Sequence, residues 1–385
     1  MLYRPVLSES ARPAIETTAA VVAERMPEIT PEFYRRMFAA HPELLDGLFS
    51  HADQASGRQS AALSGSVVTF AVALLEGQHP LDLVRRIANR HAALGVTPEM
   101  YAIVHEHLFA AIAADLGDAV TEDVAAAWSE VYWLFADLLV AAERELYGAQ
   151  ANDRFWTPWR IAAAGTPTTT VRHMTFEPAD DTPVTPAVAG QYVSVRVRTA
   201  DGLRQVRQYS LLAPGTERRI GIKRDDLGAV SPMLHALPVG AEIELSNPYG
   251  DLTLDDGDQP LVLATAGIGC TPAVGFLEAL AAQHSDRRVM VLHADRTRTD
   301  WAFSTAVEAL VRRLPGASLH TWFEDDGSRP RMTLAEVGIP LDADLVLCGP
   351  LGFMQAVRDQ ALALGVPDAQ IRYEVFGPDA WLKRA

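Results

Sequence analysis

The spacing of apolar residues changes from a helical period to a strand period partway along this chain. Within Glu122–Tyr147, Val124, Trp128 and Val131 begin a series at intervals of three and four residues, which is the spacing of one buried face of an α-helix. Segments of this kind fill the sequence from Leu7 to Tyr147, where strand-like alternation is scarce. We therefore expect the first domain, residues 1–148, to be a bundle of α-helices.

Prolines mark the expected boundaries of these helices. Proline lacks the backbone N–H that a helix interior uses, but it fits the first helical turn. We therefore expect a helix start or a turn near each of four residues: Pro31, Pro42, Pro80 and Pro98.

His91 stands out among the histidines of this helical region because of its position. It ends the amphipathic stretch Leu83–His91, and the sequence Ala-Ala-Leu-Gly-Val separates it from a helix restart at Thr97-Pro98. A histidine in a helical protein is more often a surface or core residue than a metal ligand. A helix end, however, can project an imidazole into a pocket, as a single axial ligand of haem iron requires. His91 is therefore the candidate metal ligand.

Beyond Thr168 the apolar spacing becomes two. In Tyr192–Arg198, three valines alternate with serine and arginine, which is typical of a half-exposed strand. Glycine and proline turns separate this segment from similar ones, so we expect an antiparallel β-barrel within residues 149–258, entered by a linker over Ala149–Arg160. Its other strands are expected at Val171–Phe176, Val206–Leu212, Arg218–Lys223 and Ala241–Ser246.

The motif Arg-Gln-Tyr-Ser at Arg207–Ser210 lies on one of these strands and suits a flavin. FAD needs a cation at its pyrophosphate, an aromatic ring against its isoalloxazine and a small hydroxyl near its reactive edge. Arg207 and Tyr209 share one face of an extended strand, and Ser210 supplies the hydroxyl. A surface Arg-Tyr pair in an all-β domain is the alternative interpretation of these four residues.

The last third of the chain alternates apolar strands with helical segments. This order predicts a doubly wound α/β domain over residues 259–385, with its ligands beyond the carboxyl ends of the strands. The expected strands are Pro260–Thr265, Arg288–His293, Ser318–Phe323, Asp344–Cys348 and Ile371–Val375.

Gly267–Pro272, with the sequence GIGCTP, follows the first of these strands. Gly267 and Gly269 allow close approach of the backbone. Thr271 and Pro272 begin a helix whose N-terminus favours a pyrophosphate. The motif is not the GxGxxG fingerprint, and by itself it indicates only a tight turn after a strand.

Cys348–Met354, with the sequence CGPLGFM, ends the fourth strand. Cys348 has no cysteine partner nearby in the sequence and no evident charge-relay group, which disfavours a metal-binding or nucleophilic role. Arg296 and Arg298 could contact the 2′-phosphate of NADPH, but surface arginines are common here, so the choice between NADH and NADPH stays open.

Composition narrows the partners and the compartment. The net charge of −16 disfavours nucleic acid or an anionic membrane as the main partner. The longest uncharged run, Gln259–Leu277, contains Gly267, Gly269 and Pro272, so it does not indicate a membrane span. Two cysteines, Cys270 and Cys348, cannot form a disulfide framework, and the chain opens without a signal peptide. We expect a cytoplasmic protein, and no segment indicates an obligate protein partner.

Taken together, these motifs make the whole chain resemble a flavohaemoglobin, a globin fused to an FAD- and NAD-binding reductase. The globin resemblance runs through FYRRMF, HPEL, IANRHAALGVTPEMYAIVHEHL and AERELY, and the reductase resemblance through AGQY, RQYS, GAVS, GIGCTP, CGPLGFM and YEVFGP. The resemblance implies three domains: an all-α globin, an antiparallel β-barrel for FAD and an α/β domain for the pyridine nucleotide.

The resemblance also assigns residues around a haem b. The residue matching His91 is the proximal iron ligand, and those matching Tyr101 and Glu143 hydrogen-bond around its imidazole. On the distal side, the residues matching Tyr34 and Gln59 are hydrogen-bond partners of dioxygen, and those matching Phe49 and Leu63 line the haem. In the reductase part, the residues implied to bind FAD or the nucleotide are Tyr192, Arg207, Gln208, Tyr209, Ser210, Gly228, Val230, Ser231, Gly267, Gly269, Thr271, Pro272, Cys348, Gly349, Pro350, Glu374 and Phe376.

Some of these assignments have simpler explanations, and two features depart from the family pattern. Tyr34 could be an ordinary core tyrosine, and the match at Glu143 depends on the alignment of AERELY, because Glu145 stands two residues later on another helix face. The segment before Phe49 is one residue longer than expected, and Arg90 stands where many members carry lysine, which keeps the charge and changes its geometry.

The implied activity is that of a nitric oxide dioxygenase, which oxidises nitric oxide to nitrate with dioxygen at a haem reduced by NADH or NADPH through FAD. Two other classes remain open. One is a flavin-dependent reductase of ferric iron, quinones or hydroperoxides, and the other is a haem-based sensor of oxygen or nitric oxide.

Overall fold

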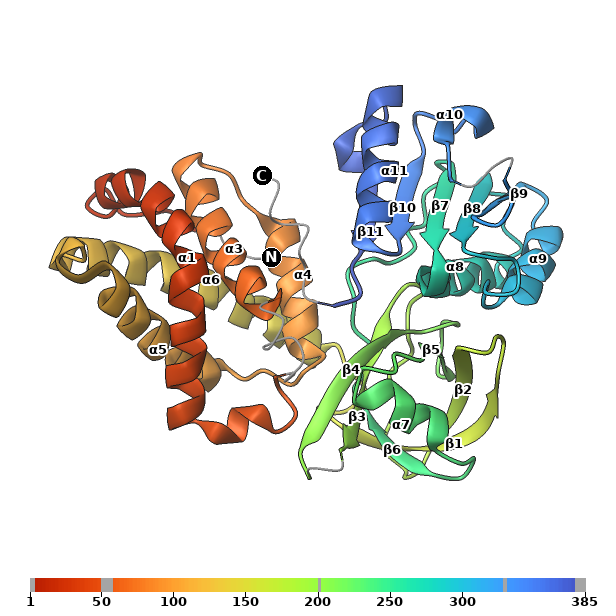
Figure 1. Ribbon diagram of the computed structural model, residues 1–385, viewed down its shortest axis with the longest axis horizontal. Helices are drawn as coiled ribbons and strands as arrows, with labels where there is room; N and C mark the ends of the chain where they lie inside the picture. The colour runs from red at the N-terminus through yellow and green to blue at the C-terminus, as the bar shows by residue number, and fades with distance from the viewer. Residues whose placement is uncertain (1–3, 50–57, 200–201, 328–330, 378–385) are drawn as a thin grey trace. The chain divides into compact units, whose positions relative to one another are not determined.

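The computed structural model describes residues 4–49, 58–199, 202–327 and 331–377, with the backbone alone over 58–64. The chain divides into two compact units. The helical unit takes the chain up to Phe155 together with Arg198–Val206, and the two-sheet unit takes Trp156–Val197 and Arg207–Gly377. Figure 1 shows the helical unit in red to gold and the two-sheet unit, with its own helices, in yellow-green to blue.

The helical unit confirms the expected all-α class. Its elements are α1 (Arg12–Ala40), the short 3₁₀ helix η1 (Pro42–Leu45), α3 (Arg58–Leu75), α4 (Leu81–Ala92), α5 (Pro98–Leu116), η2 (Gly117–Ala119) and α6 (Glu122–Gly148). One apolar core joins the α-helices that the structure describes here, and its fully buried members include Ile15, Phe33, Phe70, Val84, Leu108, Val131 and Leu138.

The prolines divide this unit largely as expected, with one exception. Pro42 begins η1, Pro80 caps α4 and Pro98 opens α5. The expectation of a boundary at Pro31 is wrong, because α1 continues through it. A proline inside a helix removes one backbone hydrogen bond, here the one that the Pro27 carbonyl would accept from position 31. Burial of the surrounding α1 residues in the core then holds the helix together.

Helix α6 is long and apolar enough to cross a membrane by length and composition alone. In this fold it packs against α1, α3, α4 and α5. Its buried residues follow the helical period and include Trp128, Tyr132, Phe135 and Leu139. We therefore interpret it as the core helix of the bundle.

The first sheet of the two-sheet unit is antiparallel and has the strand order β4-β3-β6-β1-β2-β5. Its edge strands approach each other again where Leu211 bridges Ile220, which makes the sheet a partly closed barrel. The helix α7 (Val230–Ala236) follows β5 in the chain. The strands are β1 (Thr157–Gly165), β2 (Val171–Pro178), β3 (Tyr192–Arg198), β4 (Arg204–Ser210), β5 (Arg218–Lys223) and β6 (Glu242–Leu245).

Strand β1 corrects the expected linker over Ala149–Arg160. The strand begins at Thr157 inside that segment, and Thr157, Trp159 and Ile161 alternate inward as buried residues. The following Ala162–Ala164 run has low strand propensity and conceals the pattern in the sequence. Pairing with both β2 and β6 places β1 inside the sheet.

The second sheet is parallel, with the strand order β11-β10-β7-β8-β9, so it confirms the doubly wound domain. The direction of winding reverses between β7 and β10, which is where ligands of such sheets bind. Its strands are β7 (Leu261–Ala266), β8 (Val289–Asp295), β9 (Ala317–Phe323), β10 (Asp344–Cys348) and β11 (Ile371–Glu374), and its helices are α8 (Thr271–Ala282), α9 (Ser304–Arg313), α10 (Leu334–Val337) and α11 (Leu351–Leu364).

Two glycines let α8 of the parallel-sheet domain pack directly on the barrel. A Cβ atom at Gly275 of α8 would lie 2.8 Å from the carbonyl oxygen of Leu211, just after β4. A Cβ atom at Gly190, before β3, would overlap the Leu252 carbonyl and stand 2.5 Å from the Phe276 ring. The end of β4 and the start of α8 are therefore fixed close together.

Gly190→Ala should destabilise the two-sheet unit by about 2–4 kcal/mol, because the added methyl group meets backbone and an aromatic ring at a φ of +95°. Urea unfolding followed by tryptophan fluorescence measures the change. Gly215→Ala is the matched control, since Gly215 has a φ of +89° and open space around it. Equal losses in the two variants would mean that backbone strain, and not the packing of α8, accounts for the effect.

Candidate functional site

His91 lies in the last turn of α4 and is held by residues of two other helices. Its Nδ1 atom is 2.9 Å from the hydroxyl of Tyr101 in α5 and 2.9 Å from Oε1 of Glu143 in α6. The Tyr101 hydroxyl donates to the same carboxylate oxygen. The structure thus brings together three residues that are 10 and 42 positions apart along the chain.

The hydrogen bonds determine which nitrogen of His91 carries the proton. Burial, and then the neighbouring Glu143 carboxylate, raise the pKa of Tyr101, so its hydroxyl remains a donor. A carboxylate only accepts hydrogen bonds, so the hydrogen of the His91–Glu143 bond must sit on Nδ1. In the neutral imidazole with this tautomer the lone pair lies on Nε2, which is the arrangement of a metal-ligating histidine.

Glu143 also indicates that a positive partner belongs here. Its side chain is 2% exposed, and its Oε2 atom is buried without a hydrogen bond to any residue that the structure describes. A buried carboxylate is costly unless a positive charge compensates it. Iron at His91 Nε2 would supply that charge through the imidazole, so these residues fit a haem. Glu145 is exposed, which resolves the ambiguity between the two glutamates in favour of Glu143.

An aromatic cluster surrounds Tyr34 in α1. The Tyr34 ring lies 5.6 Å from the Phe38 ring and 5.9 Å from the Phe49 ring, edge to face with the latter. Burial raises the pKa of Tyr34, so the hydroxyl stays protonated and able to donate. The longer segment before Phe49 therefore still places this ring against Tyr34. Gln59 and Leu63 belong to α3, but their side chains lie outside the described residues.

The RQYS motif forms the last four residues of β4, as expected. Arg207 and Tyr209 share one face of the strand, Gln208 takes the other, and Ser210 is buried. The Tyr209 ring packs against the barrel core, and burial raises the pKa of its hydroxyl despite the nearby Arg207. The strand thus presents a cation and an aromatic ring side by side, followed by the Ser210 hydroxyl.

Tyr192 and the GAVS segment lie on other parts of the barrel. Tyr192 opens β3 and pairs with Tyr249, and the Tyr192 ring covers Gly250. Val230 begins α7 and is buried, and Gly228 lies in the turn before it. The Ser231 hydroxyl accepts a hydrogen bond from the Asp225 backbone N–H at 2.9 Å, which fixes this turn on the helix.

The GIGCTP and CGPLGFM turns meet at the switch point of the parallel sheet. Gly267 has a φ of +55°. A Cβ atom at Gly269 would overlap the Cys348 carbonyl group and stand 2.7 Å from the Gly349 amide. A Cβ atom at Gly349 would lie 3.1 Å from Ala266 at the end of β7. Glycine is therefore required at both turns because the two backbones touch.

The helices that follow these turns begin as expected. The Thr271 hydroxyl donates to the Ile268 carbonyl at 3.0 Å, and Pro272 occupies the first turn of α8. Pro350 precedes α11. Burial raises the pKa of the Cys348 thiol well above its ordinary value, so the thiol is not an activated nucleophile.

Glu374 lies in the same row of the sheet as these turns. The register pairs Glu374 with Cys348 and Cys348 with Thr265, across β11, β10 and β7. Phe376 follows β11 and is 46% exposed, so the apolar core does not account for it. The binding roles assigned to these residues from the sequence stay predictions.

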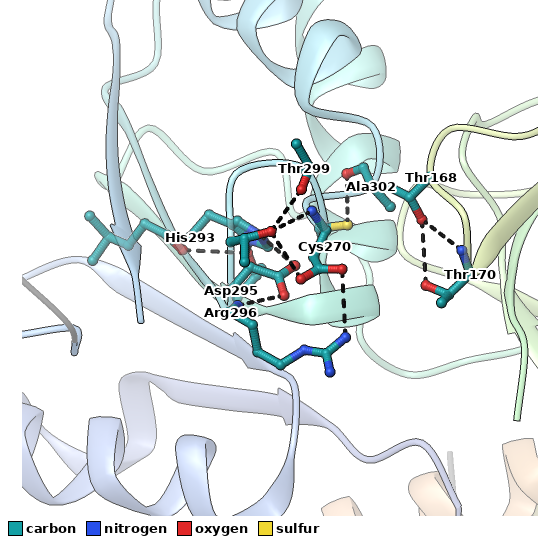
Figure 2. A network of polar contacts seen from close by, with 12 residues as sticks. Thr168, Thr170, Cys270, His293, Asp295, Arg296, Thr299 and Ala302 are labelled. Atoms are coloured by element: carbon teal, nitrogen blue, oxygen red, sulfur yellow. Dashed lines mark hydrogen bonds and ion pairs between the residues drawn. The ribbon is translucent and has the colours of Figure 1, made fainter. Parts of the chain in front are cut away.

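The sequence analysis missed a buried polar network beside the GIGC turn. Figure 2 shows Cys270, His293 and Asp295 close together there. The His293 Nδ1 atom is 2.9 Å from the Thr265 hydroxyl, and its Nε2 atom is 3.6 Å from Oδ2 of Asp295. Asp295 ends the second strand of the sheet, where an acidic residue commonly contacts the ribose of a dinucleotide. The acidic residue at the end of this predicted strand was the feature of the sequence that could have revealed the network.

Arg296 and Arg298, which follow Asp295, are both exposed and both face carboxylates. Arg296 lies 3.6 Å from Asp300, and Arg298 lies 2.5 Å from Glu308. These pairings leave the preference between NADH and NADPH open.

The chain matches two family models, Globin over residues 31–139 and Oxidoreductase NAD-binding domain over residues 263–359. The flavohemoprotein of Chromobacterium violaceum is 38% identical over 400 residues, which cover 97% of this chain and 98% of that relative. The flavohemoprotein of Bacillus subtilis is 33% identical over 396 residues, covering 96% of this chain and 98% of that relative.

Solved structures agree with these relatives. The crystal structure of flavohemoglobin from Malassezia yamatoensis with bound FAD and heme matches with a TM-score of 0.93 and 42% identity, covering 97% of this chain and all of that one. The FAD/NAD binding domain of nitric oxide dioxygenase from Vibrio cholerae matches 58% of this chain and all of that one, with a TM-score of 0.55 and 35% identity. Because such relatives align along nearly its whole length, the chain belongs to the flavohaemoglobin family, as its motifs predicted.

Proposed function

We propose that this chain is a nitric oxide dioxygenase that uses haem b, FAD and NADH or NADPH. The observation that carries the proposal is the His91–Tyr101–Glu143 cluster, which leaves Nε2 of a helix-end histidine ready for iron. The same chain contains the flavin and nucleotide motifs of a reductase. The domain of a named nitric oxide dioxygenase and a flavohemoglobin with FAD and heme are among its structural relatives.

When bound, the cofactors would supply the redox chemistry: FAD the exchange between hydride and single-electron transfer, and haem iron the chemistry of dioxygen and nitric oxide. The protein positions these groups and supplies charge. His91 Nε2 would hold the iron. Glu143 accepts from Nδ1–H, which makes the imidazole a stronger electron donor and favours oxygen activation over simple carriage. Tyr34, protonated in its apolar surroundings, would be the hydrogen-bond donor toward dioxygen.

The two-sheet unit would deliver the electrons. Arg207 would neutralise the FAD pyrophosphate, Tyr209 would pack against the isoalloxazine, and Ser210 would donate near its reactive edge. The GIGC turn and the N-terminus of α8 would receive the nucleotide. Because Gly275 of α8 touches the backbone just after Ser210, a nucleotide at this turn would lie next to a flavin on β4.

The remaining properties follow from charge and thiol chemistry. A net charge of −16 favours small-molecule partners over nucleic acid or an anionic membrane. Cys270 and Cys348 are free and buried, which suits a reducing cytoplasm. We propose a cytoplasmic enzyme that acts on dioxygen, nitric oxide and the nucleotide without an obligate protein partner.

His91→Ala should abolish nitrate formation, because the iron would lose its protein ligand, while NADH-dependent reduction of ferricyanide by the flavin should persist. NADH is added anaerobically to the haem- and FAD-loaded protein, followed by dioxygen and then nitric oxide. The haem absorbance and the amount of nitrate formed are measured. His41→Ala is the matched control, since the His41 and His91 side chains are 30% and 31% exposed.

Three results would contradict the dioxygenase and separate the other classes. Bleached flavin with unchanged haem and no nitrate from the unmodified chain would indicate a reductase of another acceptor. Turnover of ferric iron, quinones or hydroperoxides by the unmodified chain, with no nitrate formed from nitric oxide and dioxygen, would indicate the same. Reduced haem that binds nitric oxide but turns over only slowly would favour a sensor.

Glu143→Gln should lower the rate of nitrate formation roughly 10- to 100-fold, because an amide still accepts from Nδ1–H but lacks the charge that strengthens the imidazole. Steady-state assays at saturating NADH measure the change. Glu145→Gln, on the exposed side of the same helix, should have little effect. Equal rates in the Glu143→Gln variant and the unmodified chain would remove Glu143 from the mechanism.

Gly269→Ala should raise the KM for NADH and slow flavin reduction, because the methyl group would force apart the two turns at the switch point. Stopped-flow flavin absorbance measures the reduction step. Gly352→Ala, at a position in α11 with open space, is the control. Unchanged flavin reduction in a folded Gly269→Ala variant would place the nucleotide elsewhere.

A further inference from the structure

Helix α6 makes a second contact with the region of His91, one turn beyond Glu143. Tyr147 stands four residues after Glu143 and therefore on the same helix face. Its hydroxyl donates to the backbone carbonyl of Val96 at 2.7 Å. The same face of α6 thus holds both the imidazole of His91 and the turn that follows His91 in the chain.

That turn is tied back to His91 itself. The His91 carbonyl accepts hydrogen bonds from the backbone N–H groups of Leu94 at 3.0 Å and Val96 at 3.1 Å. Gly95 lies between them with a φ of +76°, a conformation that favours glycine. A displacement of Val96 therefore moves the backbone of His91, and with it the imidazole.

Phe155, the last residue of the helical unit before strand β1, covers this turn. A Cβ atom at Gly95 would lie 3.1 Å from Cγ and 3.2 Å from Cβ of Phe155, so the aromatic side chain rests on the Gly95 backbone. The Phe155 ring also packs edge to face on the Tyr147 ring, with centroids 5.2 Å apart. Phe155 is 38% exposed, and its described ring contact is to Tyr147 alone.

We propose that Phe155 is a positioning residue for His91. It clamps the Gly95 turn against Tyr147 and so keeps the Nδ1 atom of His91 aligned with Glu143. The segment that connects the helices to the first strand of the barrel then influences how strongly His91 donates to iron. This inference rests on the proposed function only in taking His91 Nε2 as the haem ligand.

The test compares the iron–histidine stretching band in resonance Raman spectra of the full-length, haem-loaded chain reduced with dithionite. This readout requires neither NADH nor turnover. Phe155→Ala should shift the band to lower frequency and broaden it, because the imidazole loses its alignment with Glu143. Tyr147→Phe, which keeps the ring and removes only the hydroxyl bond to Val96, should shift it in the same direction. Phe155→Leu keeps the atoms that touch Gly95 and should give a smaller shift.

Val72→Ala is the control, because Val72 on α3 is 39% exposed, close to the 38% of Phe155; the band of this variant should not move. Circular dichroism establishes that each variant is folded, and if Phe155→Ala is not, Tyr147→Phe and Phe155→Leu still carry the test. Bands identical to that of the unmodified chain in the folded variants would overturn the inference and leave the proposed function intact. If the unmodified chain has no iron–histidine band, both the proposed function and the positioning role of Phe155 fail.

Discussion

The hydrogen bond between His91 and Glu143 is the interaction on which the rest of this protein depends. It joins the end of α4 to the core helix α6 at 2.9 Å and fixes the proton on Nδ1, so that Nε2 can bind a metal. It also requires a carboxylate to be buried inside an apolar bundle, where a charge without a partner is costly. Tyr101 lowers that cost by donating to the same oxygen. The hydrogen bonds that orient His91 for the haem therefore also stabilise the helical core around Glu143.

The two-sheet unit depends on a different constraint, the contact of two backbones. Gly269 and Gly349 have no side chains because the turns after β7 and β10 touch. Parallel strands bring these turns to the same edge. Gly275 and Gly190 repeat the arrangement where α8 meets the barrel. Close approach at these places sets helix α8, which follows the GIGC turn, against the backbone just after Ser210.

The sequence predicted an element correctly where its apolar residues keep a single spacing. Helical spacing located α6, and alternation located β3 with its exact bounds. It failed where tertiary packing overrides local preference. Core burial carries α1 through Pro31, and pairing on both sides makes a strand of the alanine-rich β1. The contact of Phe155 with Gly95 joins residues 60 positions apart, which no local pattern reveals.

Glu143 shows how much a functional residue can reveal by violating a pattern. The buried face of α6 includes Ala136, Leu139 and Ala142, and a residue four positions after Leu139 must face the same core. The structure places position 143 on this buried face, while position 145 is exposed. An acidic residue at a core position of an apolar helix costs stability. Its presence implies a partner on another helix that repays the burial, and among the described residues that partner is a histidine at a helix end.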